Sequence, residues 1–322
     1  MRILYIGDTY TRAQYVVGNV PSHWLYGAVE MEKDGNEVIW EQESKSSGTN
    51  FNIVLNNKHD LIFIPNLNLH NHLLLLIFAA IGLYRKPIYA YLHREPASKN
   101  GWRGKMYKFL LRGLRHIFFL SPLSMDRVII NGMAKRDNCS VPGWGPDLDF
   151  YKNVPLSDNG YFVSTGKENR DYDTLIEAFR ITGVPLHIFT TTSHNGEDYR
   201  YLDKKCRDIE NIKVTLVDNS PANYKAMLTE MAAAHALVCP LRRDRLTYCV
   251  GLSTITDAEG LQKKLIITDN PYHQGRNDAF IRVDTVEDWV NAIKSLTDKS
   301  SSVRPDFSMS AAYKNMKKIM KL

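Results

Sequence analysis

Residues 162–191 read FVSTGKENRDYDTLIEAFRITGVPLHIFTT and decide the fold. They begin with a short apolar run that ends at Gly166, continue with a helical pattern from Asp171, and return to an apolar run at Leu186–Thr190. Continuous apolar strands joined through a helix are typical of a parallel sheet that is covered on both faces. The stretch therefore predicts an α/β fold built from strand-helix-strand units.

The same alternation extends in both directions along the chain. It predicts strands at 3–6, 37–40, 61–64, 88–92, 117–120, 161–165, 186–190, 212–216, 236–239 and 264–268. It predicts helices at 22–33, 71–83, 105–114, 123–131, 172–181, 199–208, 222–234, 253–260 and 286–295. The Pro- and Gly-rich stretch 141–159 interrupts the alternation and is the best linker. We expect an N-terminal domain (1–150), a C-terminal domain (151–305) and a terminal helix (306–322) that could pack back on the first domain.

Length and composition agree with two doubly wound domains. A chain of 322 residues exceeds one ordinary core and suits two domains of about 150 residues. The four cysteines form no C-x-x-C pair, which favours free thiols in a reducing compartment. The opening MRILYIG lacks the features of a signal peptide, and the apolar run 73–83 is shorter than the roughly 20 residues of a membrane span. We therefore expect a cytoplasmic protein.

Positive charge gathers in the first half of the chain. Residues 84–136 hold twelve Lys and Arg against only Glu95 and Asp126 as acids, although the whole chain carries only +6. Within this block, 102–115 predicts a helix with separate faces: Met106, Phe109, Leu110 and Gly113 on one, Lys105, Lys108 and Arg112 on another. This pattern suits an interfacial helix on an anionic membrane surface, peripheral at its inner face. An ordinary packing helix with a solvated basic face explains it nearly as well.

Two loops that follow predicted strands carry the candidate binding residues. Lys167 and Arg170 come between Gly166 and a helix start, where partial positive charge and free N–H groups suit a diphosphate. The alternative is a capped helix with two exposed basic residues.

The second loop lies within 240–270, PLRRDRLTYCVGLSTITDAEGLQKKLIITDN. The turn of Gly251, Ser253 and Thr254 can offer N–H groups and hydroxyls to a phosphate. Asp257, one helical turn on, could accept hydrogen bonds from a ribose. The alternative makes Ser253 and Thr254 helix caps and Asp257 a favourable first-turn acid.

Both loops resemble the C-terminal half of the family 4 glycosyltransferases and their GT-B relatives. GKENRDYDTLIEAF resembles the family's Gly-Arg, Lys-Gly-x-Asp, Leu-Ile-Glu-Ala-Phe segment, with Lys167 in the arginine's place and Arg170 in the lysine's. GLSTITDAEGLQKKLIITD resembles the end of the family's Glu-x7-Glu motif, with Asp257 in the second glutamate's place and Cys249 in the first. The resemblance covers most of 160–270, whereas the first half matches more loosely through MRILYIG, DGNEVIW, YLHREP, FFLSPLSMDRV and VPGWGPDLDFY.

The resemblance implies a GT-B fold, with two Rossmann-like domains facing a cleft. It implies a retaining glycosyltransferase that takes a hexose or related sugar from a UDP- or GDP-sugar to a glycan or lipid-linked glycan acceptor, in bacterial-type polysaccharide synthesis. Gly166, Lys167, Arg170, Gly251, Ser253, Thr254 and Asp257 would bind the donor. His93, which ends the strand of YLHREP, would face the donor sugar as the catalytic residue, although a histidine bonded to its own loop is the alternative. Glu95 is a weaker candidate for a base.

Other functions stay open or are disfavoured. The same fold could serve a sugar-nucleotide 2-epimerase, and Cys249 in a carboxylate's place leaves room for a non-catalytic nucleotide-sugar-binding subunit. Neither DLD at 147–149 nor DYD at 171–173 follows a hydrophobic strand as a Mg²⁺ or Mn²⁺ pair requires, so we expect no metal. No G-x-G-x-x-G follows the first strand and no Walker loop is present, so we expect no cofactor. We also expect no nucleic acid partner.

Overall fold

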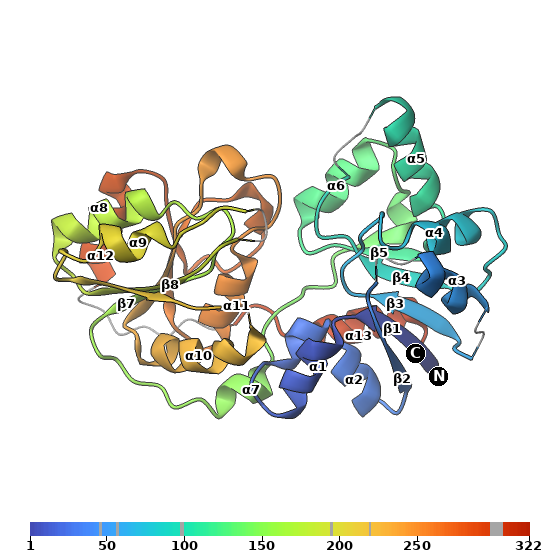
Figure 1. The fold of residues 1–322 in the computed structure, drawn as a ribbon, viewed down its shortest axis with the longest axis horizontal. Coiled ribbons are helices and arrows are strands. Elements are labelled where there is room, and N and C mark those ends of the chain that lie inside the picture. The colour runs from blue at the N-terminus through green and yellow to red at the C-terminus, as the bar shows by residue number, and fades with distance from the viewer. Residues whose placement is uncertain (45–46, 56–57, 97–99, 194–195, 219, 297–304) are drawn as a thin grey trace. The chain divides into compact units, whose positions relative to one another are not determined.

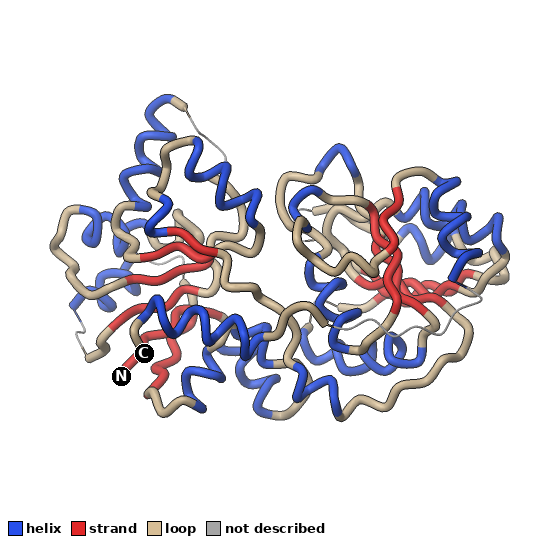
Figure 2. Tube along the Cα trace, turned by 180° about the vertical axis from the view of Figure 1, so that it is seen from behind, coloured by secondary structure: helices blue, strands red, loops and turns tan. Residues whose placement is uncertain are grey.

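The computed structural model describes residues 1–44, 47–55, 58–96, 100–193, 196–218, 220–296 and 305–322. The chain divides into two compact units. Unit 1 comprises Met1–Val17, Ser22–Gly145 and Phe307–Leu322, and unit 2 comprises Gly18–Pro21 and Pro146–Asp306. Figure 2 shows the strands of each unit gathered into a sheet with helices beside it.

Unit 1 is built on a parallel sheet of six strands in the order β2-β1-β3-β4-β5-β6. The strands β3 and β4 are buried at every residue because their runs LIFI and IYAY lie in the middle of the sheet, covered on both faces. The strands span β1 (Arg2–Gly7), β2 (Glu37–Gln42), β3 (Leu61–Ile64), β4 (Ile88–Tyr91), β5 (His116–Phe118) and β6 (Cys139–Ser140).

The helices of unit 1 cover this sheet (Figure 1). They span α1 (Thr9–Val16), η1 (Ser22–Leu25), α2 (Ala28–Lys33), α3 (Ser47–Leu55), α4 (Leu73–Ala80), α5 (Gly101–Leu111), α6 (Pro122–Ile130), η2 (Arg136–Asn138) and α13 (Met309–Met320). Helix α13 joins unit 1 from the other end of the chain: Tyr313 Oη donates to Asp34 Oδ2 at 2.8 Å, and Lys317 pairs with the same carboxylate at 2.6 Å. None of the helices described is both long and apolar enough to cross a bilayer.

Unit 2 has six parallel strands in the order β12-β11-β10-β7-β8-β9. Counted within the unit, this is the doubly wound order 3-2-1-4-5-6 in reverse, and the order changes direction between β7 and β10. The strands span β7 (Phe162–Thr165), β8 (Leu186–Thr190), β9 (Ile212–Leu216), β10 (Ala236–Cys239), β11 (Lys264–Thr268) and β12 (Ile281–Val283).

Two long helices of unit 2, α8 and α12, pack side by side, with Phe179 and Trp289 in one apolar core. The α-helices span α7 (Leu148–Lys152), α8 (Tyr172–Thr182), α9 (Tyr201–Lys205), α10 (Tyr224–Ala233), α11 (Leu252–Gly260) and α12 (Val286–Leu296). Short 3-10 turns lie at η3 (Pro221–Asn223), η4 (Arg243–Arg245) and η5 (Pro271–His273).

All ten predicted strands are present within a residue or two of their expected bounds, and the Rossmann-like fold class is confirmed. The strands β6 and β12, which have two and three residues, were missed, as were α1, α3 and α7. The expected helix at 22–33 is wrong, because the positive φ angles of Tyr26 and Gly27 separate η1 from α2.

Candidate functional site

The two candidate loops follow neighbouring strands, β7 and β10, where the strand order of unit 2 reverses. Their backbones are joined by hydrogen bonds from Asp171 N to Pro240 O at 3.2 Å and from Arg242 N to Asn169 O at 2.9 Å. Ligands of open α/β sheets bind beyond the carboxyl ends of the strands at such a reversal. The structure therefore brings the two loops together at the edge where a ligand is expected.

Arg170 lies buried beneath the first loop. The alternative from the sequence, a capped helix with two exposed basic residues, is therefore wrong for this residue. Only 3% of the residue is exposed. Its guanidinium donates to Glu168 O at 2.8 Å, to Thr165 O at 3.2 Å and to Thr254 Oγ1 at 3.4 Å. No carboxylate among the described residues pairs with it. A buried charge held only by neutral acceptors is costly, and an anion bound nearby would offset that cost.

Gly166 makes this burial possible. Its φ is +112°, and a Cβ at this position would collide with the guanidinium of Arg170, so a larger residue would displace the arginine. Lys167 follows at the half-buried surface, and burial lowers its pKa, with the opposing attraction of Glu168 smaller. Two cations thus lie in the same loop, Lys167 near its surface and Arg170 buried beneath it.

The start of α8 is capped by the protein's own side chain, as the alternative from the sequence assumed. The carboxylate of Asp171 caps this helix: it accepts from Thr174 N at 3.2 Å and from Thr174 Oγ1 at 2.8 Å. The cap engages the N–H group of Thr174, so the side chains of Lys167 and Arg170 are the charged groups that this loop can offer an anion.

Helix α11 begins without a side-chain cap. Gly251 occupies the N-cap with φ +89°, so neither Ser253 nor Thr254 is the cap that the alternative assumed. Ser253 is exposed, whereas Thr254 is buried and receives the bond from Arg170. An uncapped helix start and one exposed hydroxyl remain for an anionic ligand.

Asp257 is fixed by two tyrosines that the sequence did not indicate. Tyr151 Oη donates to its Oδ1 at 2.7 Å and Tyr224 Oη to the same oxygen at 2.6 Å, which leaves Oδ2 outside both bonds. The side chain is buried, and burial raises the pKa of Asp257 to about 6 against the lowering effect of the tyrosines. The carboxylate is thus held in one orientation. Tyr151 lies on α7, inside the stretch taken as a linker, so no spacing pattern connected it with Asp257.

Cys249, at the place where the resemblance expects a carboxylate, is buried. The side chain of Glu259 is fully buried and pairs with Arg276 at 2.7 Å. Burial raises the pKa of Glu259 and lowers that of Arg276, which works against the attraction within the pair. This carboxylate is therefore committed to an internal ion pair.

His93 follows β4 in unit 1, half-buried beside the aromatic ring of Tyr26. Its Nε2 lies 2.9 Å from Pro65 O. A carbonyl oxygen only accepts, so Nε2 carries the proton and Nδ1 presents a lone pair. Burial lowers the pKa of His93 to about 4, and the imidazole is neutral near pH 7. Glu95, the weaker candidate, pairs with Arg127 at 3.5 Å.

In the helix proposed for membrane contact, only the basic face is exposed to solvent. Met106 and Phe109 pack against the core of unit 1 and Leu110 is buried, so this apolar face covers the protein's own interior. The basic side chains of the helix and of the residues just beyond it are exposed; these are Arg103, Lys105, Lys108, Arg112 and Arg115. Trp102, at the start of the helix, is 69% exposed. The packing-helix alternative is therefore correct for the apolar face.

Three of the four carboxylates in the two acidic pairs considered as metal decoys are engaged by the protein. Asp147 caps α7 through Phe150 N, Asp171 caps α8, and Asp173 pairs with Lys205. Across the residues that the structure describes, no three His, Cys, Asp or Glu side chains are grouped to hold a metal ion. The absence of metal and cofactor remains a prediction.

Comparisons with known proteins show a fold and no family. No family model matches the chain, and no curated protein matches its sequence. A UDP-N-acetylglucosamine 2-epimerase from Neisseria meningitidis, solved with UDP-GlcNAc bound, has a TM-score of 0.59 at 9% identity and covers 100% of both chains. A second UDP-N-acetylglucosamine 2-epimerase has a TM-score of 0.61 at 9% identity, covering 99% of this chain and 95% of that one.

A third structure is a glycosyltransferase, AviGT4, involved in avilamycin A biosynthesis. It has a TM-score of 0.53 at 11% identity and covers 99% of this chain and 93% of that one. The three likenesses, together with the two six-stranded parallel sheets, show that the chain has the two-domain Rossmann-like fold called GT-B. At such low identity they leave its reaction open.

Proposed function

We propose that this chain is a glycosyltransferase that moves a sugar from a UDP- or GDP-sugar to an acceptor hydroxyl. The observation that carries the proposal is the buried guanidinium of Arg170, which no described carboxylate neutralises, at the strand-order reversal of unit 2. A diphosphate bound over this loop would supply the missing negative charge. The resemblance of both loops to the family 4 glycosyltransferases supports the same assignment.

Each candidate residue then has a role that its geometry permits. Lys167 and Arg170 stabilise the charge that develops on the leaving diphosphate. Gly251, Ser253 and Thr254 offer the uncapped start of α11 and a hydroxyl to a phosphate. Asp257 accepts from a ribose hydroxyl through Oδ2, the oxygen that neither tyrosine uses.

The sugar end of the reaction involves His93. Its Nδ1, the nitrogen left unprotonated by the bond to Pro65, accepts a hydrogen bond from a sugar hydroxyl. With a pKa of about 4 this imidazole is a weak base, so it orients the sugar more than it removes protons. In the retaining reaction that the resemblance implies, the leaving phosphate takes the acceptor's proton and no separate base is needed.

An epimerase is the second candidate, because two of the structures with a similar fold are UDP-N-acetylglucosamine 2-epimerases. It would invert the configuration at C2 of the sugar in a nucleotide-sugar without any acceptor, and it would need carboxylates around the sugar. The buried thiol of Cys249 stands where the family resemblance expects one such group. The same thiol motivates a third candidate, a subunit that binds nucleotide-sugars without turning them over.

The acceptor is proposed to be a glycan, or a lipid-linked glycan at an anionic membrane surface on the cytoplasmic side. The exposed basic face of α5 and the exposed Trp102 support such docking. The apolar face of the helix does not contribute, because it packs inside unit 1.

A thermal-shift screen of UDP- and GDP-sugars, followed by product analysis with and without acceptors, tests the proposal. A ligand that binds only the native state raises its melting temperature. We expect a shift that is lost in Arg170→Met, and sugar transfer only when acceptor is present. An epimerised sugar formed without acceptor would favour the second candidate, and binding without any product the third. If no nucleotide-sugar or free UDP or GDP binds, the proposed donor site is wrong.

A further inference from the structure

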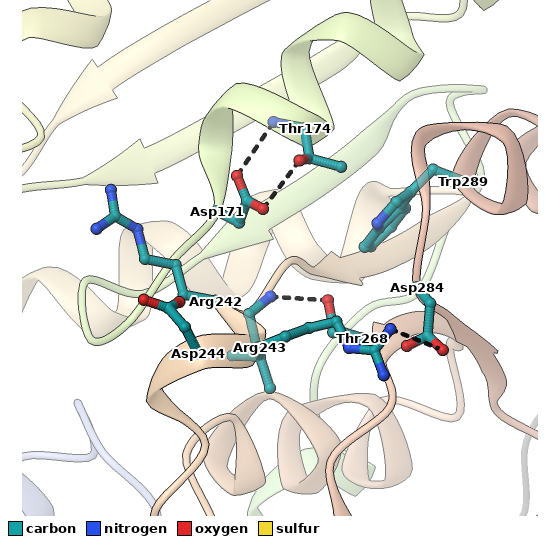
Figure 3. A pocket seen from close by; sticks show the side chains of 9 residues that line it. Asp171, Thr174, Arg242, Arg243, Asp244, Thr268, Asp284 and Trp289 are labelled. Carbon is teal, nitrogen blue, oxygen red and sulfur yellow. Dashed lines mark hydrogen bonds and ion pairs between the residues drawn. The ribbon is translucent and has the colours of Figure 1, made fainter.

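Unit 2 contains a pocket of about 420 Å³ that none of the candidate donor residues lines. It lies between the start of α8, the loop after β10, the ends of β11 and β12, and α12, as Figure 3 shows. Its volume falls within the range of roughly 300–1,000 Å³ that is typical of small-ligand sites. The pocket is therefore large enough for a ligand of its own.

Trp289 of α12 contributes the most informative group. The residue is 1% exposed, and its indole N–H makes no hydrogen bond with any residue that the structure describes. Figure 3 shows the ring projecting among the other side chains that line the pocket. Because a buried tryptophan N–H usually has an acceptor, this donor marks a position where a ligand oxygen would bind.

Thr268 and Asp284 add polar groups around the same space. Thr268 Oγ1 accepts from Leu241 N at 2.8 Å, so its own proton can be donated to a ligand. Asp284 Oδ2 pairs with Arg243 at 3.2 Å, and both side chains are partly exposed. The pocket thus offers donors and acceptors close together, which is what hydroxyl groups require.

The charges of the lining disfavour an anionic ligand. Its carboxylates belong to Asp171, Asp244 and Asp284, and its guanidinium groups to Arg242 and Arg243. The guanidinium groups are already paired, Arg242 with Glu197 and Arg243 with Asp284. A phosphate would add repulsion from the carboxylates, whereas a neutral hydroxyl can donate to them.

We propose that this pocket is a binding site for a neutral saccharide, separate from the donor site. Oxygens of the saccharide accept from Trp289 and Thr268, and its hydroxyls donate to Asp284. The site would hold part of a glycan on unit 2 without taking part in sugar transfer. It goes beyond the proposed function and does not depend on it, since the test below reads saccharide binding and needs no donor or turnover.

Nuclear magnetic resonance of the full chain labelled with ¹⁵N at tryptophan tests this inference. The sequence has five tryptophans, so the spectrum holds few indole signals, and Trp289→Phe identifies the one from the pocket. If that variant does not fold, variants at Trp24, Trp40, Trp102 and Trp144 assign the signal by elimination. The labelled protein is titrated separately with maltose, cellobiose and lactose, and with inorganic phosphate and UDP.

We expect at least one of the three saccharides to shift the Trp289 signal, and phosphate and UDP to leave it in place. Asp284→Asn should weaken the saccharide's binding by about tenfold, because a hydrogen bond to a charged group is lost. Glu177→Gln, which breaks an exposed ion pair with Arg180 on α8, is the matched control and should bind as the wild type does. The inference is overturned if no saccharide shifts the signal, if phosphate or UDP shifts it instead, or if Asp284→Asn binds the saccharide unchanged.

Discussion

Changing Asp257 to asparagine should alter stability in a way that depends on pH. The carboxylate of Asp257 is buried and bonded by Tyr151 and Tyr224 through one oxygen. Burial raises its pKa from 3.8 to about 6, so the folded protein holds this proton more tightly than the unfolded chain does. Most structural carboxylates behave in the opposite way, because their partners lower the folded-state pKa.

The sign and size of the effect follow from that shift. Between pH 4 and pH 6 the folded state binds more protons than the unfolded state, so wild-type stability falls as pH rises through this window. A shift of about two units at about 1.4 kcal/mol each gives a total loss of about 3 kcal/mol above pH 6. Asparagine stays neutral at every pH. We therefore expect Asp257→Asn to be more stable than the wild type by up to about 3 kcal/mol at pH 7 and to lose that advantage near pH 4.

Urea unfolding from pH 4 to pH 8 measures this difference. Because the chain has two units, unfolding of unit 2 should be followed separately, by amide hydrogen exchange of α11. Tyr224→Phe removes one donor and should move the window to higher pH. Glu177→Gln should show the opposite pH trend, because Arg180 lowers the pKa of Glu177. A stability difference between Asp257→Asn and wild type that is the same at pH 4 and pH 8 would refute the reasoning.

Three further predictions concern activity and docking. Arg170→Met and Lys167→Met should each raise the donor KM about tenfold or more in steady-state kinetics, while Arg180→Met, on the exposed end of α8, should not; unchanged kinetics in the double variant would remove the diphosphate site. His93→Ala should lower turnover strongly without weakening UDP or GDP binding, and an equal loss of nucleotide affinity would make His93 a structural residue. Protonation of His93 should not lower wild-type turnover until the pH approaches about 4. Changing Lys105, Lys108 and Arg112 to Glu should weaken co-sedimentation with anionic vesicles at least about a hundredfold, and equal wild-type binding to neutral vesicles would reject electrostatic docking.

The fold was largely predictable because its strands are buried on both faces. Runs such as LIFI and KLIIT are apolar throughout, and burial of every residue in β3 and β11 agrees with that pattern. The missed elements lack such a signal. Helix α1 buries only Thr11, so its sequence has no apolar stripe, and β6 is two residues long. Short or polar elements form because contacts with neighbouring parts of the fold stabilise them, and no local sequence pattern indicates such contacts.

The candidate site was predicted in its loops but not in its contacts. The positions of Gly166 and Gly251 after β7 and β10 could be anticipated, since strand ends and glycines are visible in the sequence. The burial of Arg170 could not, because its acceptors include Thr254, 84 residues away along the chain. Likewise, the bond from Tyr151 to Asp257 spans 106 residues and joins an irregular segment to a helix. Such pairs are set by tertiary packing, which periodicity does not report.

The return of α13 to unit 1 has a consequence for biosynthesis. When the nascent chain has emerged from the ribosome as far as Asp306, every residue of unit 2 is present. Helix α13, which contacts Asp34 and whose Met309 and Met316 are buried in unit 1, has not yet emerged. Unit 2 can therefore complete its folding first, whereas unit 1 must wait with its α13 site uncovered although most of its residues emerged earlier. During that interval the nascent protein exposes an apolar surface on unit 1, which is where a chaperone would be expected to bind.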